Sequence, residues 1–77
     1  MERVNVFLRT PLYSVGGGGA HLPSGVLLLE GMLMERDGAG IRIEADRFLD
    51  ARGRELLEET LTLVLPWEKI DHVLIID

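Results

Sequence analysis

The sequence predicts an all-β fold, a small barrel of five strands, and three features of the chain support this prediction. Short segments in which apolar and polar residues alternate recur along its 77 residues, and a period of two is typical of strands that bury one face. Glycine and proline separate these segments and mark the turns between them. Strands of this length close naturally into a barrel, because closure removes the sheet edges that promote aggregation.

Length and composition bound the domain organisation. A chain of 77 residues forms one domain, residues 1–77, with no room for a second core. The absence of cysteine excludes disulfides and thiolate metal sites. Because 47% of the residues are hydrophobic and small domains have much surface to cover, we expect association between copies of the chain.

The N-terminal half predicts two strands joined by a long loop. Residues 4–9 alternate and are rich in β-branched side chains, and Pro11 ends this strand because proline cannot donate to a ladder. A loop over residues 10–24 follows, and residues 25–35 form the second strand. Within this strand Gly31 indicates a bulge or a bend, which a small barrel needs in order to curl.

The C-terminal half predicts the remaining strands. Asp37-Gly38 is typical of a tight hairpin turn. Residues 54–60 leave a helical turn and a loop equally open, and residues 67–69 predict a single tight or 3₁₀ turn. The strands predicted here cover residues 41–46, 60–65 and 70–76.

Charge and hydropathy restrict the partners and the location. The net charge is −5, from 8 basic and 13 acidic residues, which argues against a general polyanion binder. The charged N-terminus lacks the apolar run of a signal peptide. The longest apolar stretches have four residues, as in Val26–Leu29, and are too short to cross a bilayer. We therefore expect a soluble cytoplasmic protein that does not bind membranes.

Two segments carry a resemblance to a known class of folds. Residues 25–46, "GVLLLEGMLMERDGAGIRIEAD", and residues 63–75, "LVLPWEKIDHVLI", resemble parts of the Sm-like proteins, which belong to the SH3-like small barrels. The first is similar to their long bent strand, turn and following strand, and the second to their closing strands with a one-turn link. The resemblance implies an SH3-like or Sm-like barrel and a ring-like assembly.

The resemblance to Sm-like proteins does not extend to their RNA site. The uridine pocket of Sm-like proteins needs an asparagine or a comparable polar group soon after the aspartate, whereas Asp46 is followed by Arg47 and then by two apolar residues. The Arg-Gly of their second motif is absent, because the link begins at Trp67 and contains no glycine.

The glycine run at residues 14–25, "SVGGGGAHLPSG", raises the question of a phosphate site. A Walker loop needs a lysine after its last glycine, and no lysine lies within reach. The dinucleotide fingerprint needs a glycine where His21 stands and a helix afterwards, whereas a strand follows. We interpret the run as a linking loop, and the alternative is a ligand or partner contact at Gly17, Gly18 and His21.

No catalytic or metal constellation is evident in the sequence. The two histidines, His21 and His72, lack the spacing of metal ligands. Asp71 and His72 are adjacent in a strand, which predicts side chains on opposite faces and no acid–base pair. We therefore predict no catalysis, no metal and no cofactor. The alternative is a small enzyme or metal protein that uses His21 with Glu44 or Asp46 across subunits.

Apolar side chains left on the outer faces of the strands predict an interface. A contiguous exposed patch of this kind usually marks a protein contact, unless the long loop and Leu56-Leu57 fold over it. Trp67 is predicted to close one end of the core, and an exposed indole would instead indicate a partner contact. The predicted self-association surface consists of Phe7, Leu28, Met32, Met34, Val64, Leu74 and Ile76.

These observations predict a homo-oligomeric binding or structural module without catalysis, with a further protein partner left open. The second alternative is an Sm-like ring that binds RNA. Its contacts would be the arginines Arg42, Arg47, Arg52 and Arg54.

Overall fold

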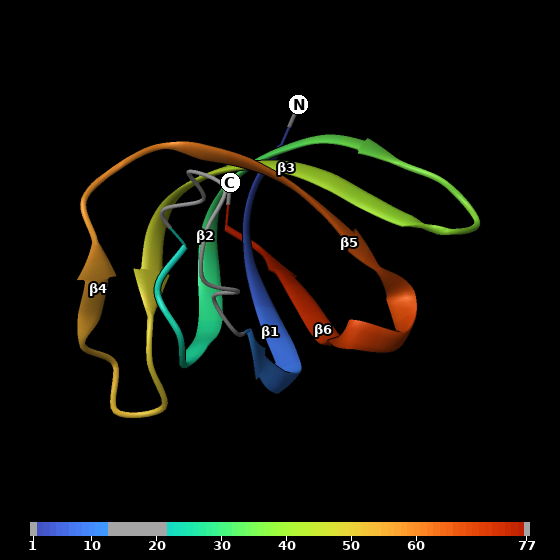
Figure 1. Cartoon of the computed structure of the whole chain (residues 1–77). Helices are drawn as coiled ribbons and strands as arrows, with labels where there is room; N and C mark the ends of the chain where they lie inside the picture. The colour runs from blue at the N-terminus through green and yellow to red at the C-terminus, as the bar shows by residue number, and fades with distance from the viewer. Residues whose placement is uncertain (1, 13–21, 77) are drawn as a thin grey trace.

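The protein folds as a single antiparallel sheet. A computed structural model describes residues 2–12 and 22–76 (Figure 1). This part of the chain contains no α-helix and no helix that has the length and hydropathy needed to span a membrane. Its elements are β1 (Glu2–Leu12), β2 (Val26–Arg36), β3 (Gly40–Leu49), β4 (Glu55–Leu57), β5 (Leu61–Pro66), the 3₁₀ helix η1 (Trp67–Lys69) and β6 (Ile70–Ile75).

The strands follow the order β4-β3-β2-β1-β6, and β5 also pairs with β3. The two short strands share one edge of β3, since β5 pairs with Gly40–Ala45 and β4 with Phe48–Leu49. The sheet is strongly bent, and the short helix η1 connects β5 to β6 (Figure 1). No ladder joins β5 to β6 within the described residues, so the sheet stays open there.

The prediction of an all-β fold is confirmed, whereas the five-stranded barrel is not: the described residues form six strands, and their sheet is not closed. The additional strand is β4. It lies within residues 54–60, for which the sequence left a helical turn and a loop equally open. Asp50 Oδ1 accepts hydrogen bonds from the backbone N–H groups of Arg52 at 2.8 Å and Arg54 at 3.0 Å. Gly53 adopts a φ of 79°. This turn returns the chain directly onto β3, where an extended segment finds partners for its backbone.

The first strand continues past Pro11 to Leu12, so the predicted loop over residues 10–24 begins too early. Leu12 pairs with Val26, and Gly25 N donates to Leu12 O at 2.8 Å. The β1–β2 register shifts between Phe7 and Leu12. Pro11 lies in this irregular part of the ladder, where its missing N–H breaks no regular pairing.

The predicted bend at Gly31 is confirmed as a bulge in the β2–β3 ladder. Glu30 pairs with Arg47 and Gly31 with Ala45, so one additional residue, Asp46, lies on β3. A Cβ at Gly31 would come within 2.1 Å of Glu44 O. Only glycine allows the two backbones to approach this closely.

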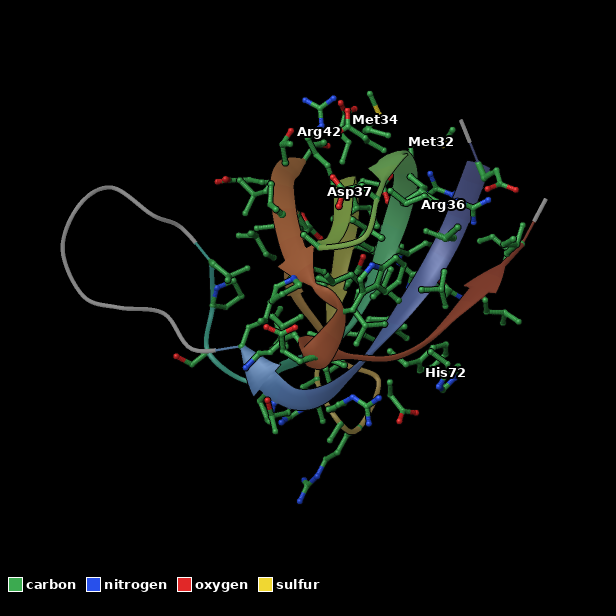
Figure 2. All side chains as sticks on the ribbon, turned by 90° about the vertical axis from the view of Figure 1, so that its right-hand side faces the viewer. Met32, Met34, Arg36, Asp37, Arg42 and His72 are labelled. Atoms are coloured by element: carbon green, nitrogen blue, oxygen red, sulfur yellow. The ribbon has the colours of Figure 1, made fainter. Side chains whose placement is uncertain are left out.

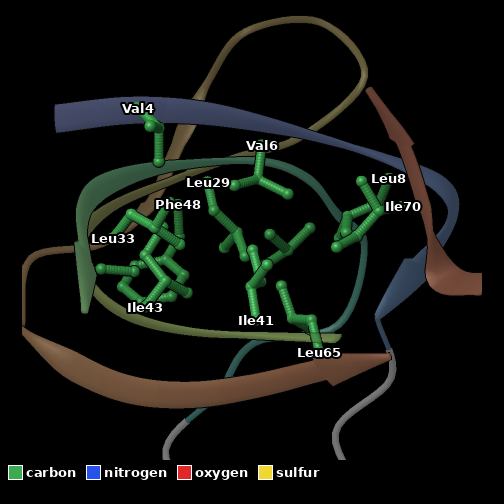
Figure 3. Packing of buried hydrophobic residues seen from close by; sticks show 12 residues of the cluster. Val4, Val6, Leu8, Leu29, Leu33, Ile41, Ile43, Phe48, Leu65 and Ile70 are labelled. Atoms are coloured by element: carbon green, nitrogen blue, oxygen red, sulfur yellow. The ribbon is translucent and has the colours of Figure 1, made fainter. Parts of the chain in front are cut away.

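The core fills the concave side of the bent sheet (Figure 3). The predicted inward positions Ile41, Ile43 and Ala45 are all buried, in agreement with the alternation along β3. The largest side chains that are completely buried are Phe48, Leu29, Ile43, Val4, Val6 and Val26. The core thus contains side chains from β1, β2 and β3, while β5 and β6 contribute Leu65 and Ile70 at its open side.

Candidate functional site

The Asp71–His72 pair on β6 is the most distinctive polar arrangement at the open side. On the β1–β6 ladder, Phe7 pairs with His72 and Leu8 with Ile70, so Asp71 is the additional residue of a bulge. A bulge changes the direction of the side chains next to it. Asp71 Oδ2 consequently lies 2.7 Å from His72 Nδ1. The prediction that these neighbours point to opposite faces is therefore wrong, because it assumed a regular strand.

The imidazole of His72 is held on two sides. Its ring stacks on Phe7 with a centroid separation of 4.2 Å and an interplanar angle of 12°. Arg9 Nη1 lies 4.0 Å from the other oxygen of Asp71. Since the carboxylate occupies Nδ1, the ring nitrogen left for a ligand is Nε2. The pair thus places a carboxylate beside an imidazole.

Two concave regions share Asp71 and His72. The Phe7 hollow, of about 400 Å³, lies toward the turn after β3 and is lined by Phe7, Leu27, Leu28, Asp50 and Ala51 among others. The Trp67 hollow, also of about 400 Å³, lies between β6, η1 and the β2–β3 hairpin. Its lining includes Leu33, Ile41, Ile70, Val73, Trp67, Arg9 and Arg36. Figure 2 shows the molecule from the side on which β5 and β6 lie, and it labels Arg36 and His72.

Trp67 lies against the β2–β3 turn and stays accessible. Its indole Nε1 donates to Asp37 O at 2.7 Å, and its backbone N donates to Ala39 O at 3.2 Å. These bonds attach η1 to the β2–β3 turn and fix the plane of the ring. Because 38% of its surface is exposed, the prediction that Trp67 closes one end of the core is not confirmed, and a partner contact stays a prediction.

A second polar cluster crosses the outer face of the sheet. Arg3 Nη2 lies 2.9 Å from Glu30 Oε2 and 2.8 Å from Asp46 Oδ1. Arg47 bridges Glu30 at 3.5 Å and Glu55 at 3.3 Å. The hydrogen bonds to Asp46 and Glu30 raise the pKa of Arg3 above its ordinary value. This network joins β1, β2, β3 and β4, and we interpret it as structural.

Most of the arginines considered for RNA have carboxylate partners. Arg42 pairs with Glu35 at 3.7 Å, and Arg54 pairs with Asp50 at 2.9 Å. Arg47 belongs to the outer network, and Arg52 is exposed. Because the neighbouring acids neutralise most of this charge, the four arginines do not form a basic surface.

The predicted self-association residues differ in their exposure. Phe7, Leu28 and Met32 are half-buried. The exposed members are on separate strands: Met34 on β2, Val64 on β5, and Leu74 with Ile76 at the end of the chain. Ile75, which the sequence did not assign to this surface, is 51% exposed, and among the described residues β6 pairs with β1 alone.

The predicted loop contacts Gly17, Gly18 and His21 lie outside the described residues. Glu44, one suggested partner of His21, is exposed, and Asp46 is paired with Arg3. Within residues 2–12 and 22–76, no group of three or more histidine, cysteine, aspartate or glutamate side chains could hold a metal ion.

Comparison with known proteins finds no matching family model, no matching curated protein and no matching solved structure. The interpretation of the site therefore depends on its geometry and chemistry.

Proposed function

We propose that the chain is a non-catalytic binding module that assembles with copies of itself through the open edge of β6. The observation that carries this proposal is the exposure of Leu74, Ile75 and Ile76, at 51%, 51% and 41%. Three consecutive exposed aliphatic side chains at a sheet edge are costly for a monomer, and burial in a partner is the usual solution.

The backbone at this edge is suited to a further strand. Ile76 N donates to Arg3 O at 3.0 Å, which directs its N–H toward β1. Because hydrogen bonding alternates along an antiparallel strand, the N–H and C=O groups of Val73 and Ile75 point away from β1. A second strand placed there would pair with these groups and cover the exposed aliphatic side chains.

A second copy of the chain is a suitable occupant because this segment contains no charge between His72 and Ile76. In an antiparallel pair of β6 strands related by a two-fold axis, the same surface meets itself. A pair centred on Val73 puts Asp71 opposite Ile75 and His72 opposite Leu74 of the other copy. Like charges then do not face each other across the strands.

We also propose that the fold is SH3-like. Its support is the order β6-β1-β2-β3-β5 with a one-turn 3₁₀ link before the last strand, together with the resemblance in residues 25–46 and 63–75. A cytoplasmic location is part of the same proposal, and it is supported by the cysteine-free, acidic composition.

Light scattering over a range of protein concentrations tests the assembly. We expect a mass of at least two chains for the wild type and of one chain for Ile75→Lys. Ala51→Lys is the matched control, because it adds the same charge at an exposed turn position and should leave the mass unchanged. A monomeric wild type at every concentration would refute the proposed assembly.

A further inference from the structure

We propose that the Trp67 hollow binds a small ligand that carries a single carboxylate on an apolar body. This site goes beyond the proposed self-association, which pairs the backbone of β6 along Asp71–Ile75. The hollow shares Asp71, His72 and Val73 with that segment, and Ile70 together with residues of β1, β2, β3 and η1 forms the rest of its lining. Its apolar floor, its aromatic wall and the charge at its rim each support one part of this ligand.

The floor of the hollow is apolar. Leu33, Ile41 and Ile70, from three different strands, are 8%, 3% and 4% exposed, and half-buried Val73 continues this surface. The volume of about 400 Å³ lies within the range of about 300–1,000 Å³ that is typical of small-molecule sites. The site therefore favours the body of a hydrocarbon or aromatic ligand over a fully polar one.

The wall formed by Trp67 is already in place. Its indole N–H donates to Asp37 O at 2.7 Å, so the orientation of the ring does not depend on the ligand. Since this donor is occupied, the ring offers apolar surface to a ligand rather than a hydrogen bond. A ring fixed in advance also lowers the entropy cost of binding.

The rim supplies the charge complementarity. Arg36, at the end of β2, makes no ion pair with any residue in 2–12 or 22–76. Arg9 has only a 4.0 Å contact with Asp71, and that carboxylate also lies 2.7 Å from His72 Nδ1. Both guanidinium groups line the hollow, so cations with little or no pairing border an apolar site in a chain whose net charge is −5.

The balance of these charges favours a monoanion. Two arginines, Arg9 and Arg36, oppose one carboxylate, Asp71, which leaves one positive charge at the rim when His72 is neutral. A single carboxylate neutralises that charge, and its two oxygens fit the fork of a guanidinium group. A phosphate dianion would leave an uncompensated negative charge beside the apolar floor.

Trp67 is the single tryptophan of the chain, so its fluorescence reports on this hollow. We would titrate the full chain with octanoate, octanol and octylammonium, all below their micelle-forming concentrations. These probes share the same alkyl body and differ in charge. We expect octanoate to change the emission of Trp67 and to bind at least tenfold more tightly than octanol, with octylammonium weakest.

The variant Arg36→Gln should reduce the preference for octanoate over octanol to less than threefold, without changing the affinity for octanol. Arg52→Gln is the matched control, because Arg52 is exposed and does not line the hollow. Equal binding of octanoate and octanol by the wild type would overturn the proposal, as would an unchanged preference in Arg36→Gln or no binding by fluorescence and calorimetry.

The same titration in Ile75→Lys separates the two proposals. Octanoate binding by a chain that scatters as a monomer supports the ligand site, whether or not the wild type assembles. If the wild type assembles but does not prefer octanoate over octanol, the ligand site is refuted and the proposed assembly is not.

Discussion

Asp71 Oδ2 and His72 Nδ1 lie 2.7 Å apart, although adjacent residues of a regular strand point to opposite faces. The bulge at Asp71 removes that alternation, and the stacking on Phe7 at 4.2 Å holds the imidazole in the position where the carboxylate reaches it. This contact places one polar pair at the border of both hollows.

The first prediction concerns the tautomer of His72. In the neutral ring, a carboxylate at Nδ1 favours the form in which Nδ1 carries the proton and donates it. We expect ¹⁵N chemical shifts of the imidazole to show a protonated Nδ1 in the wild type and a larger population protonated at Nε2 in Asp71→Ala. Identical nitrogen shifts in the two proteins would contradict the contact.

The second prediction concerns the close approach of β2 and β3 at Gly31. A methyl group there would come within 2.1 Å of Glu44 O and 2.6 Å of Ala45 Cα, and backbone atoms cannot rotate away. We expect Gly31→Ala to lower the free energy of unfolding by about 2 kcal/mol or more, because the strands must separate. Chemical denaturation followed by circular dichroism measures this change.

Gly38→Ala is the control for that substitution. A Cβ at Gly38 meets no atom within 4 Å, so the free energy of unfolding should change by no more than about 0.5 kcal/mol. If both variants lose the same stability, the loss comes from replacing glycine in general and the close approach is not its cause.

The third prediction concerns the bond between the Trp67 indole and Asp37 O. Trp67→Phe keeps an aromatic ring and removes the donor, so we expect the free energy of unfolding to fall by about 1 kcal/mol. Trp67→Ala should cost more, because the partly buried surface of the ring is also lost. Circular dichroism is the appropriate probe, since both variants lack tryptophan. Equal stability of Trp67→Phe and the wild type would show that this bond does not stabilise the fold.

The fourth prediction is a pH dependence centred on Asp50. The hydrogen bond from the Arg54 backbone is the main cause that lowers the pKa of Asp50 below its ordinary value of 3.8, and the Arg52 backbone and the Arg54 guanidinium contribute. A group whose pKa is lower in the folded state than in the unfolded state stabilises the folded state at pH values above its unfolded pKa. This contribution disappears as the pH falls through the pKa of the folded state.

We therefore expect Asp50→Asn to be less stable than the wild type at neutral pH. Asparagine keeps an oxygen acceptor but removes the charge, so the difference should shrink as the pH falls below 3.8. Denaturation of both proteins between pH 2 and pH 7 measures it. A difference that stays constant over this range would mean that the charge of Asp50 is not responsible.

The amino-acid sequence by itself determined the strand-forming segments and the buried faces of the regular strands. The alternation of Ile41, Ile43 and Ala45 predicted the face that β3 buries, because side chains of a strand repeat every second residue. Gly31 predicted the β2–β3 bulge, since close approach of two backbones requires a missing Cβ.

Only the tertiary structure decided the features that depend on pairing between distant segments. The bulge at Asp71 arises from the register of β6 against β1, and β4 forms because the turn at Asp50 returns the chain onto β3. The position of Arg36 above an apolar hollow likewise requires β2, η1 and β6 to meet. Local residue patterns specify a period and a turn, whereas register, openness of a sheet and the neighbours of a side chain are set by contacts between segments far apart in the chain.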